Sequence, residues 1–223
     1  MSNPKLRRTL YIGLGGTGIK IVKEVKKNFL NSSSNSLPSM VKFLCIDTNK
    51  GDLEGKNYEG PEKLTSLEKL HLSVYDPQAT LIDGGTIYDW IPKSNRDSVI
   101  DIEGTGAGQV RSNGRFILED SEIKHHAFSD RLDQLYNQLI SITNNDPNYD
   151  LLPATNIDVH LIFSIAGGTG SGMFLSVANL IRRHIPKANL MAYAFAPSFF
   201  TSAGVNWNIT HNAYGALIEL DYY

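Results

Sequence analysis

The sequence lacks several features that mark whole classes of protein. Cys45 is its only cysteine, so no disulfide can form within the chain, and a reducing, cytoplasmic compartment is favoured. A net charge of −2 gives no basic surface for nucleic acids or anionic membranes. No apolar run approaches the roughly 18–20 residues of a membrane span. We therefore expect no nucleic-acid partner and no membrane span.

The histidines do not have the sequence spacing of a metal site. The six histidines include the neighbours His125 and His126, but no pair has the spacing of a metal site, so surface histidines are expected. What the chain does have is 223 residues with 41% hydrophobic content, enough for one globular domain with a sizeable core.

The order of apolar and glycine-rich segments predicts the fold class. Short apolar runs at 9–12, 41–46, 157–165 and 190–195 are typical of buried strands, and apolar residues recur at helical spacing after the first and third. Residues 98–102 are a strand or a loop entry, 50–97 are only partly helical, and 112–142 and the segment from 208 are helical. Strands that alternate with helices indicate an α/β fold, a Rossmann-like, doubly wound, mostly parallel sheet with helices on both faces.

Three glycine-rich loops lie where this fold places ligands, at the carboxyl ends of strands. They are GLGGTG at 13–18, GTGAG at 104–108 and GGTGSG at 167–172. Glycines let phosphate oxygens approach the unpaired N–H groups of a helix N-terminus without interference from Cβ atoms. Because GGTGSG contains no Lys or Arg, phosphate charge would be met by backbone dipoles, the hydroxyls of Thr169 and Ser171, and a bound cation.

The first loop alone is compatible with more than one nucleotide site. A P-loop is rejected because Ile19 stands where its lysine is required. The dinucleotide fingerprint GxGxxG fits residues 13–18, and Asp47 follows Gly18 by 47 − 18 = 29 residues, where about 20 is typical. A Rossmann module of an oxidoreductase that binds NAD or FAD therefore stays open, although it leaves the other two loops unexplained.

The glycine-rich loops, taken together, resemble the corresponding loops of one protein family. AGGTGSG, residues 166–172, resembles the signature loop of tubulin, GGGTGSG, and of the bacterial division tubulin FtsZ, GGGTGTG. GTGAGQVRSNGR, at 104–115, resembles GLGAGANPEVGR of FtsZ, and FLCIDTN, at 43–49, resembles FIAINTD with Asn and Asp exchanged. NAYGALIEL, at 212–220, resembles the tubulin helix that follows the sugar-binding loop. The chain thus looks like a bacterial tubulin-like protein of the tubulin/FtsZ superfamily of GTPases.

This resemblance implies a site for GTP or GDP with Mg²⁺. The first and third loops would hold the α- and β-phosphates, the second would approach the γ-phosphate, and Pro197 and Ser198 would open the ribose loop. Asp47 and Asn49 would orient Mg²⁺-bound water or touch the base, and no residue would bind the metal directly. The nucleotide-binding residues expected on this basis are Gly15, Gly16, Thr17, Gly18, Asp47, Asn49, Gly106, Ala107, Gly108, Gln109, Ala166, Gly167, Gly168, Thr169, Gly170, Ser171, Gly172, Pro197 and Ser198.

The resemblance also implies what the chain alone would do. Tubulins continue into a central helix that reads guanine and a second domain whose acidic loop completes the site of the next subunit, so residues 1–223 would be a truncated nucleotide-binding domain. Filament assembly head to tail and GTP hydrolysis would belong to the full-length protein, and this piece would be nearly inactive. A non-hydrolysing tubulin-like scaffold is the other open alternative. The ribose loop departs from the family pattern, because Thr201 stands where FtsZ has a glutamate.

Overall fold

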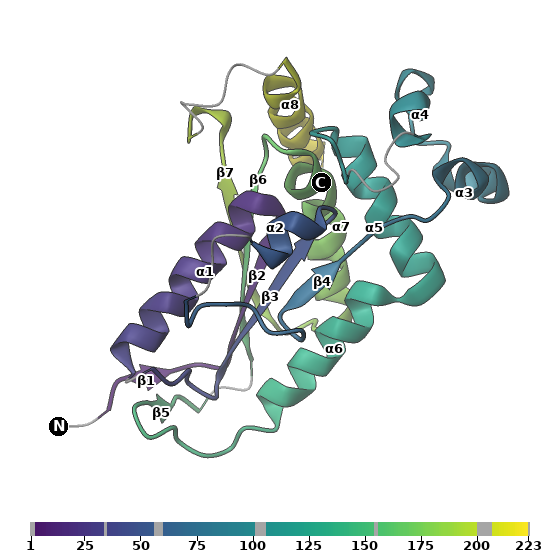
Figure 1. Cartoon of the computed structure of the whole chain (residues 1–223). Helices are drawn as coiled ribbons and strands as arrows, with labels where there is room; N and C mark the ends of the chain where they lie inside the picture. Colours follow the sequence, from purple (N-terminus) through teal and green to yellow (C-terminus); the bar gives the residue numbers. More distant parts are fainter. Residues whose placement is uncertain are drawn as a thin grey trace.

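A parallel sheet forms the centre of the molecule in the computed structural model, which describes residues 3–33, 35–55, 60–100, 106–153, 156–199 and 207–222. Its five strands lie in the order β4 (Lys69–His71), β3 (Val41–Asp47), β2 (Thr9–Leu14), β6 (Asp158–Ser164) and β7 (Asn189–Phe195) (Figure 1). All four pairings are parallel.

The strand order reverses direction once, between β2 and β6. From β2 the chain continues outward through β3 to β4 on one side, and later through β6 to β7 on the other. Doubly wound sheets bind ligands in the crevice outside the carboxyl ends of strands at such a switch point. The fold therefore directs attention to the ends of β2 and β6.

Helices cover both faces of the sheet. Leu10, Ile12 and Leu14 of β2 belong to a core cluster that also includes residues of α5 (Arg111–His125), α6 (Ala127–Ile140) and α7 (Gly168–His184). Tyr11, which alternates with them, packs against a second cluster that contains Ile19 of α1 (Gly15–Ser32). Because successive side chains of a strand point to opposite faces, this alternation places α1 on one face and the other three helices on the opposite face. The α/β class expected from the sequence is confirmed.

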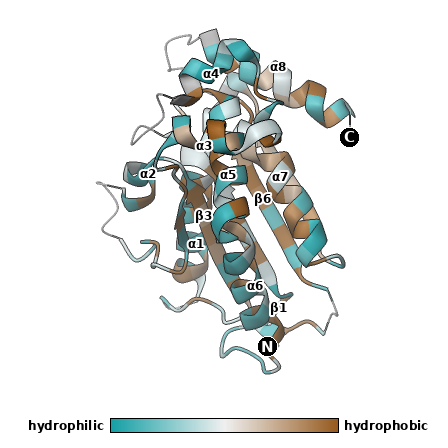
Figure 2. Ribbon diagram, turned by 90° about the vertical axis from the view of Figure 1, so that its right-hand side faces the viewer, coloured by the Kyte–Doolittle hydropathy of each residue, from teal (hydrophilic) through white to brown (hydrophobic). Residues whose placement is uncertain are grey.

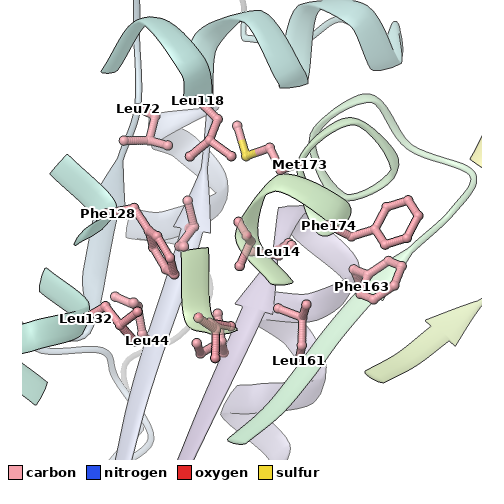
Figure 3. Packing of buried hydrophobic residues seen from close by; sticks show 14 of the residues in the cluster. Leu14, Leu44, Leu72, Leu118, Phe128, Leu132, Leu161, Phe163, Met173 and Phe174 are labelled. Carbon is pink, nitrogen blue, oxygen red and sulfur yellow. The ribbon is translucent and has the colours of Figure 1, made fainter. Parts of the chain in front are cut away.

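The larger core lies between the sheet and α5, α6 and α7. Figure 3 shows Leu14, Leu44 and Leu161 of the strands facing Leu118, Phe128 and Met173 of the helices, with Phe163 and Phe174 side by side. The rings of Phe163 and Phe174 are stacked with centroids 4.7 Å apart. In Figure 2 the strands are mostly brown and lie among helices that carry both colours, as expected of amphipathic helices that enclose a buried parallel sheet.

Shorter elements complete the chain. Residues between β3 and α5 form α2 (Lys50–Glu54), α3 (Pro77–Asp83), the 3₁₀ turn η1 (Gly85–Tyr88) and α4 (Lys93–Ile100). β1 (Lys5–Leu6) pairs in parallel with β5 (Asp150–Leu151) at the end of the molecule that holds the N-terminus (Figure 1). The turn η2 (Pro197–Phe199) follows β7, and α8 (Trp207–Tyr222) lies at the opposite end, beside the carboxyl ends of the strands.

Two expectations from the sequence are corrected. Residues 98–100, expected as part of a strand or loop entry, belong to helix α4. Residues 101–105, which include Gly104, lie outside the described residues. The single helical stretch expected at 112–142 is two helices. They separate at His126, whose φ of +48° is left-handed, and the Glu122 carboxylate accepts hydrogen bonds from the backbone N–H groups of Phe128 and Ser129 at the start of α6.

One face of the sheet is less covered than the other near β7. Met191 and Tyr193 keep 38% and 44% of their surface exposed, and β7 pairs only with β6 among the described strands. On this face His160 of β6 stacks between Tyr11 and Tyr193, and its Nδ1 atom lies 3.0 Å from the Tyr193 hydroxyl. β7 is thus an outer strand with an aromatic, partly exposed surface.

Candidate functional site

A cavity of about 310 Å³ lies at the switch point of the sheet. Its walls come from the loop between β2 and α1, the end of β3 with the start of α2, the loop before α5, and the loop between β6 and α7. The lining residues are Leu14, Gly15, Gly16, Thr17, Asp47, Thr48, Asn49, Asp52, Ala107, Gly108, Gln109, Ser164, Gly167, Gly168, Thr169 and Gly170. Residues of all three glycine-rich loops therefore face one space.

The first and third loops begin helices directly at the cavity. Leu14 and Gly167 are the N-cap residues of α1 and α7, and neither helix has a side-chain hydrogen bond at its N-cap or an acidic residue in its first turn. Gly15 has a φ of +69°, which a residue with a side chain rarely adopts. Both helices therefore present backbone N–H groups and the positive ends of their dipoles to the cavity.

The loop before α5 is bent sharply and held from several sides. Gly106 and Gly108 have φ values of +74° and +56°, and the non-glycine residue Gln109 has +60°. The backbone N–H of Ala107 donates to the Thr48 hydroxyl over 2.9 Å, and the Asn113 amide donates to the Ala107 carbonyl over 3.3 Å. These contacts fix a left-handed turn against the end of β3.

The end of β3 contributes a buried carboxylate. Asp47 is 2% exposed, and its Oδ1 atom accepts hydrogen bonds from the Asn49 backbone N–H at 3.1 Å and the Thr169 hydroxyl at 3.2 Å. Its Oδ2 atom is buried with no hydrogen-bond partner among the described residues. Burial raises the pKa of Asp47 to about 6, and the nearby Asp52 adds to the rise while these hydrogen bonds oppose it.

The charge of the lining is acidic rather than basic. Asp47 and Asp52 are its ionisable members, and no Lys or Arg lines the described part of the cavity. An anion bound here would meet backbone N–H groups, hydroxyls and carboxylates. The site can therefore hold a polyphosphate only if helix dipoles and a cation offset these carboxylates.

Oxygen donors suited to such a cation are present. Asp47, Asn49 and Asp52 supply carboxylate and amide oxygens, the ligands that Mg²⁺ prefers, and the unpartnered Oδ2 of Asp47 could accept from a metal-bound water. The described residues contain no cluster of three or more His, Cys, Asp or Glu side chains that would hold a metal by themselves. The donor set fits a cation that is bound mainly by the anion in the cavity and only through water by the protein.

The structure brings together twelve of the residues expected from the sequence and places the others elsewhere. Those that line the cavity are Gly15, Gly16, Thr17, Asp47, Asn49, Ala107, Gly108, Gln109, Gly167, Gly168, Thr169 and Gly170. Those that do not are Gly18, Gly106, Ala166, Ser171, Gly172, Pro197 and Ser198. Pro197 and Ser198 lie in η2 after β7, and Thr201 lies outside the described residues.

Several residues beside the cavity have packing roles instead. A Cβ atom on Gly18 would lie 2.4 Å from the Ile162 carbonyl oxygen, so this glycine lets α1 approach β6. A Cβ atom on Gly172 would lie 2.1 Å from the Arg111 carbonyl oxygen, so it lets α7 approach α5. The Ser171 hydroxyl is buried and donates to the Gly167 carbonyl, which leaves it within its own helix turn.

Four lining residues were missed by the sequence analysis. Thr48 precedes Asn49, and Asp52 follows it by three residues. Asn49 caps α2 by accepting a hydrogen bond from the Gly51 backbone N–H. Leu14 and Ser164 are the last residues of β2 and β6. The Asn-x-x-Asp spacing from Asn49 to Asp52 was the one available signal, because it is typical of a helix start that would follow β3 closely.

No helix in the described part of the chain has the length and apolar content to cross a membrane.

Comparison with known proteins identifies the family. The family model described as "Tubulin like" matches residues 10–223, which is nearly the whole chain. No curated protein matched the sequence.

Solved structures share the fold at low sequence identity. CetZ from Methanosaeta thermophila matches with a TM-score of 0.57 and 16% identity over 97% of this chain and 43% of that one. CetZ1 from Haloferax volcanii, a GDP-bound monomer, matches with a TM-score of 0.54 and 14% identity over 96% of this chain and 47% of that one. A mutant FtsZ from M. jannaschii matches with a TM-score of 0.52 and 15% identity over 98% of this chain and 44% of that one. The chain thus spans less than half the length of these structures.

Proposed function

Because the chain belongs to the tubulin-like family, we propose that its cavity binds the phosphates of a guanine nucleotide. The observation that carries this proposal is the convergence of three glycine-rich loops, with Asp47 and Asn49, on one cavity at the switch point of the sheet. The CetZ1 structure similar to this chain is GDP-bound, which supports a guanine nucleotide as the ligand.

Two uncapped helix N-termini supply the attraction for phosphate. Gly15 and Gly16 at the start of α1, and Gly167 and Gly168 at the start of α7, allow phosphate oxygens to reach backbone N–H groups closely. Gly106, Ala166 and Pro197 would then act through the loops that they belong to, without lining the cavity themselves. Mg²⁺, bound to the phosphates with Asp47 and Asn49 ordering its waters, would neutralise phosphate charge that no basic residue of the lining meets.

We assign GTP hydrolysis and head-to-tail self-association to a longer, cytoplasmic protein that contains this domain. Hydrolysis is the attack of a positioned water on the γ-phosphate, with the developing charge stabilised by preorganised backbone N–H groups. A neighbouring subunit would supply the remaining acidic group. The 223-residue chain by itself would bind weakly and turn over negligibly.

Calorimetric titration of the chain with GTP, GDP, ATP and NAD, each with Mg²⁺ and with EDTA, tests the proposal. GTP and GDP should bind, compete with each other, and lose affinity in EDTA, whereas NAD should produce no saturable heat. The proposal would be contradicted if neither GTP nor GDP bound. Sustained phosphate release by the purified chain would contradict the assignment of hydrolysis to a longer protein.

A glycine variant separates the site from the fold. A Cβ atom on Gly167 would meet nothing within 4 Å, and its φ of −85° suits any residue. Gly167→Ala should therefore keep the melting temperature while its methyl group lowers GDP affinity by about tenfold or more, a loss of roughly 1.4 kcal/mol. Gly170→Ala is the contrast, because its Cβ atom would lie 2.8 Å from the Ser164 carbonyl oxygen and should destabilise the fold.

One observation favours a second candidate, a dinucleotide-binding module. Gly18 permits the close helix–strand contact of the dinucleotide fingerprint, and Asp47 ends the strand next to β2 and faces the cavity. Saturable binding of NAD, tighter than that of GDP, would establish this candidate in place of the first.

A further inference from the structure

Helix α8 contacts two of the cavity's loops without lining the cavity. Asn212 is 5% exposed, and its Nδ2 atom donates to two backbone carbonyls, that of Gln109 over 2.7 Å and that of Ala166 over 3.0 Å. Gln109 belongs to the loop before α5 and Ala166 to the loop before α7. One side-chain amide therefore joins two walls of the cavity.

The Gln109 carbonyl belongs to a backbone that needs external support. Gln109 has a φ of +60°, a left-handed conformation that costs a residue with a side chain about 1–2 kcal/mol. Such conformations persist only where the surroundings fix them. The hydrogen bond from Asn212 is one of these surroundings, since it acts on the carbonyl of the strained residue itself.

A second contact holds α8 in place two turns further along. The Arg111 guanidinium forms two hydrogen bonds with the Glu219 carboxylate, at 2.7 and 2.8 Å, and a third with the Ser171 carbonyl at 3.1 Å. Residues 212 and 219 are seven apart, so they share one face of the helix. Ala213 and Ala216 are small and buried, and they let that face approach α7. This α8 face is anchored to the first turns of both α5 and α7.

We propose that Asn212 is a positioning residue that sets the spacing of the two loops and thereby the affinity of the cavity for phosphates. The proposal rests on the proposed function for its ligand, and on the contacts of Asn212 with the loops before α5 and α7 for its geometry. Both amide hydrogens of Asn212 are used, so loss of this side chain removes a bond from each loop at once. Nucleotide contact is made by the loops, and Asn212 acts only through them.

The isosteric variant Asn212→Asp tests this role, since a carboxyl group has no hydrogen to donate when ionised and only one when protonated, so it cannot keep both bonds. Asn212→Ala is the second variant, which removes the amide without adding charge. Ala216→Gly is the matched control, because it weakens the same helix at a residue that is 1% exposed and touches neither carbonyl. The probes are GDP with Mg²⁺ in calorimetry, thermal melting, and hydrogen exchange of the ligand-free protein.

Both Asn212 variants should lower GDP affinity by about tenfold or more, the range expected when buried carbonyls lose their donor. Ala216→Gly should change the affinity less than about twofold at a similar loss of melting temperature. Affinity that falls in proportion to the melting temperature in all three variants would overturn the proposal, because the role would then be structural.

Hydrogen exchange separates failure of this proposal from failure of the proposed function. In ligand-free protein, amides at 107–110 and 167–168 should exchange about tenfold faster in the Asn212 variants than in Ala216→Gly, because the loops lose their shared anchor. Equal exchange overturns the positioning role even where GDP binds. If the unmodified chain binds no GDP, the proposed function fails, and the exchange rates alone decide the role of Asn212.

Discussion

Asp47 combines burial with a negative charge at the centre of the site. Its pKa is raised to about 6 from an ordinary 3.8, chiefly by burial, and its Oδ2 atom has no partner in the described parts of the chain. A raised carboxyl pKa means that the fold favours the protonated form. The associated stability is present below about pH 4 and is lost as the pH rises through about 6.

Asp47→Asn should therefore change the pH dependence of stability. The amide mimics the protonated acid, and its Oδ1 can keep the bonds from Asn49 and Thr169. Ligand-free variant and unmodified chain should be about equally stable near pH 4, and the variant should be more stable by up to about 3 kcal/mol near pH 7.5, since the shift is about 2 pKa units. Urea unfolding across this range measures the difference, and a constant offset at every pH would contradict the explanation.

At the residue scale, sequence reasoning found the glycines of the cavity more readily than its polar groups. Gly15, Gly108 and Gly167 stand out because glycine is costly unless a backbone must turn or be approached. Thr48 carries no comparable signal. Its hydroxyl matters because it lies 2.9 Å from both the Thr169 hydroxyl and the Ala107 nitrogen, contacts that span 121 and 59 residues. Only the assembled fold brings such partners together.

At the scale of elements, α5 and α7 cross with their backbones almost in contact. A Cβ atom on Gly114 would lie 2.4 Å from the Gly168 carbonyl oxygen, and one on Gly172 would lie 2.1 Å from that of Arg111. These two glycines bring the first turns of both helices together beside the cavity. The crossing therefore fixes where two of the three loops end.

Gly114→Ala and Gly172→Ala should each destabilise the protein. Alanine within an unhindered helix would stabilise it by about 0.5–1 kcal/mol, whereas backbone overlap should reverse the sign and cost about 1–3 kcal/mol. A change of this size lowers the melting temperature by about 2–4 °C per kcal/mol in a chain of this length. Scanning calorimetry of both variants decides, and a raised melting temperature in either would show that the helices can separate there.

The elements themselves were predicted to different degrees. β2, β3, β6 and β7 follow from apolar runs, and the observed bounds differ from those expected by at most two residues at each end. β4 was missed because Lys69–His71 is too short to show alternation. The division between α5 and α6 was missed because it occurs at His126, where no glycine or proline marks the end of a helix.

For the whole molecule, the sheet should be the most stable unit and its margins the least. β2 and β6 are central, and Leu10, Ile12, Val159 and Leu161 are fully buried, so their backbone hydrogen bonds should open only with global unfolding. β7 has a neighbour on one side only within the described structure. Hydrogen exchange followed by residue should give slow amides throughout β2 and β6 but protection at alternate residues of β7. Uniform protection along β7 would show that something covers its outer side.

The doubly wound arrangement follows from the sequence because β–α alternation leaves few ways to build a parallel sheet. The pairing of β1 with β5 does not follow from it. Two strands of two residues each, joined at Lys5 with Asp150 and Leu6 with Leu151, carry no periodic pattern, and 145 residues separate the partners. Such contacts are consequences of the finished fold rather than of local sequence.

The outer strand β7 has a practical consequence for work with the isolated chain. No strand of the described structure pairs with its outer side, so backbone groups there can hydrogen-bond to an extended peptide, and the exposed Met191 and Tyr193 side chains would add apolar contact to such pairing. We therefore expect concentrated samples to form β-rich aggregates over time, and we expect Tyr193→Lys to reduce their formation.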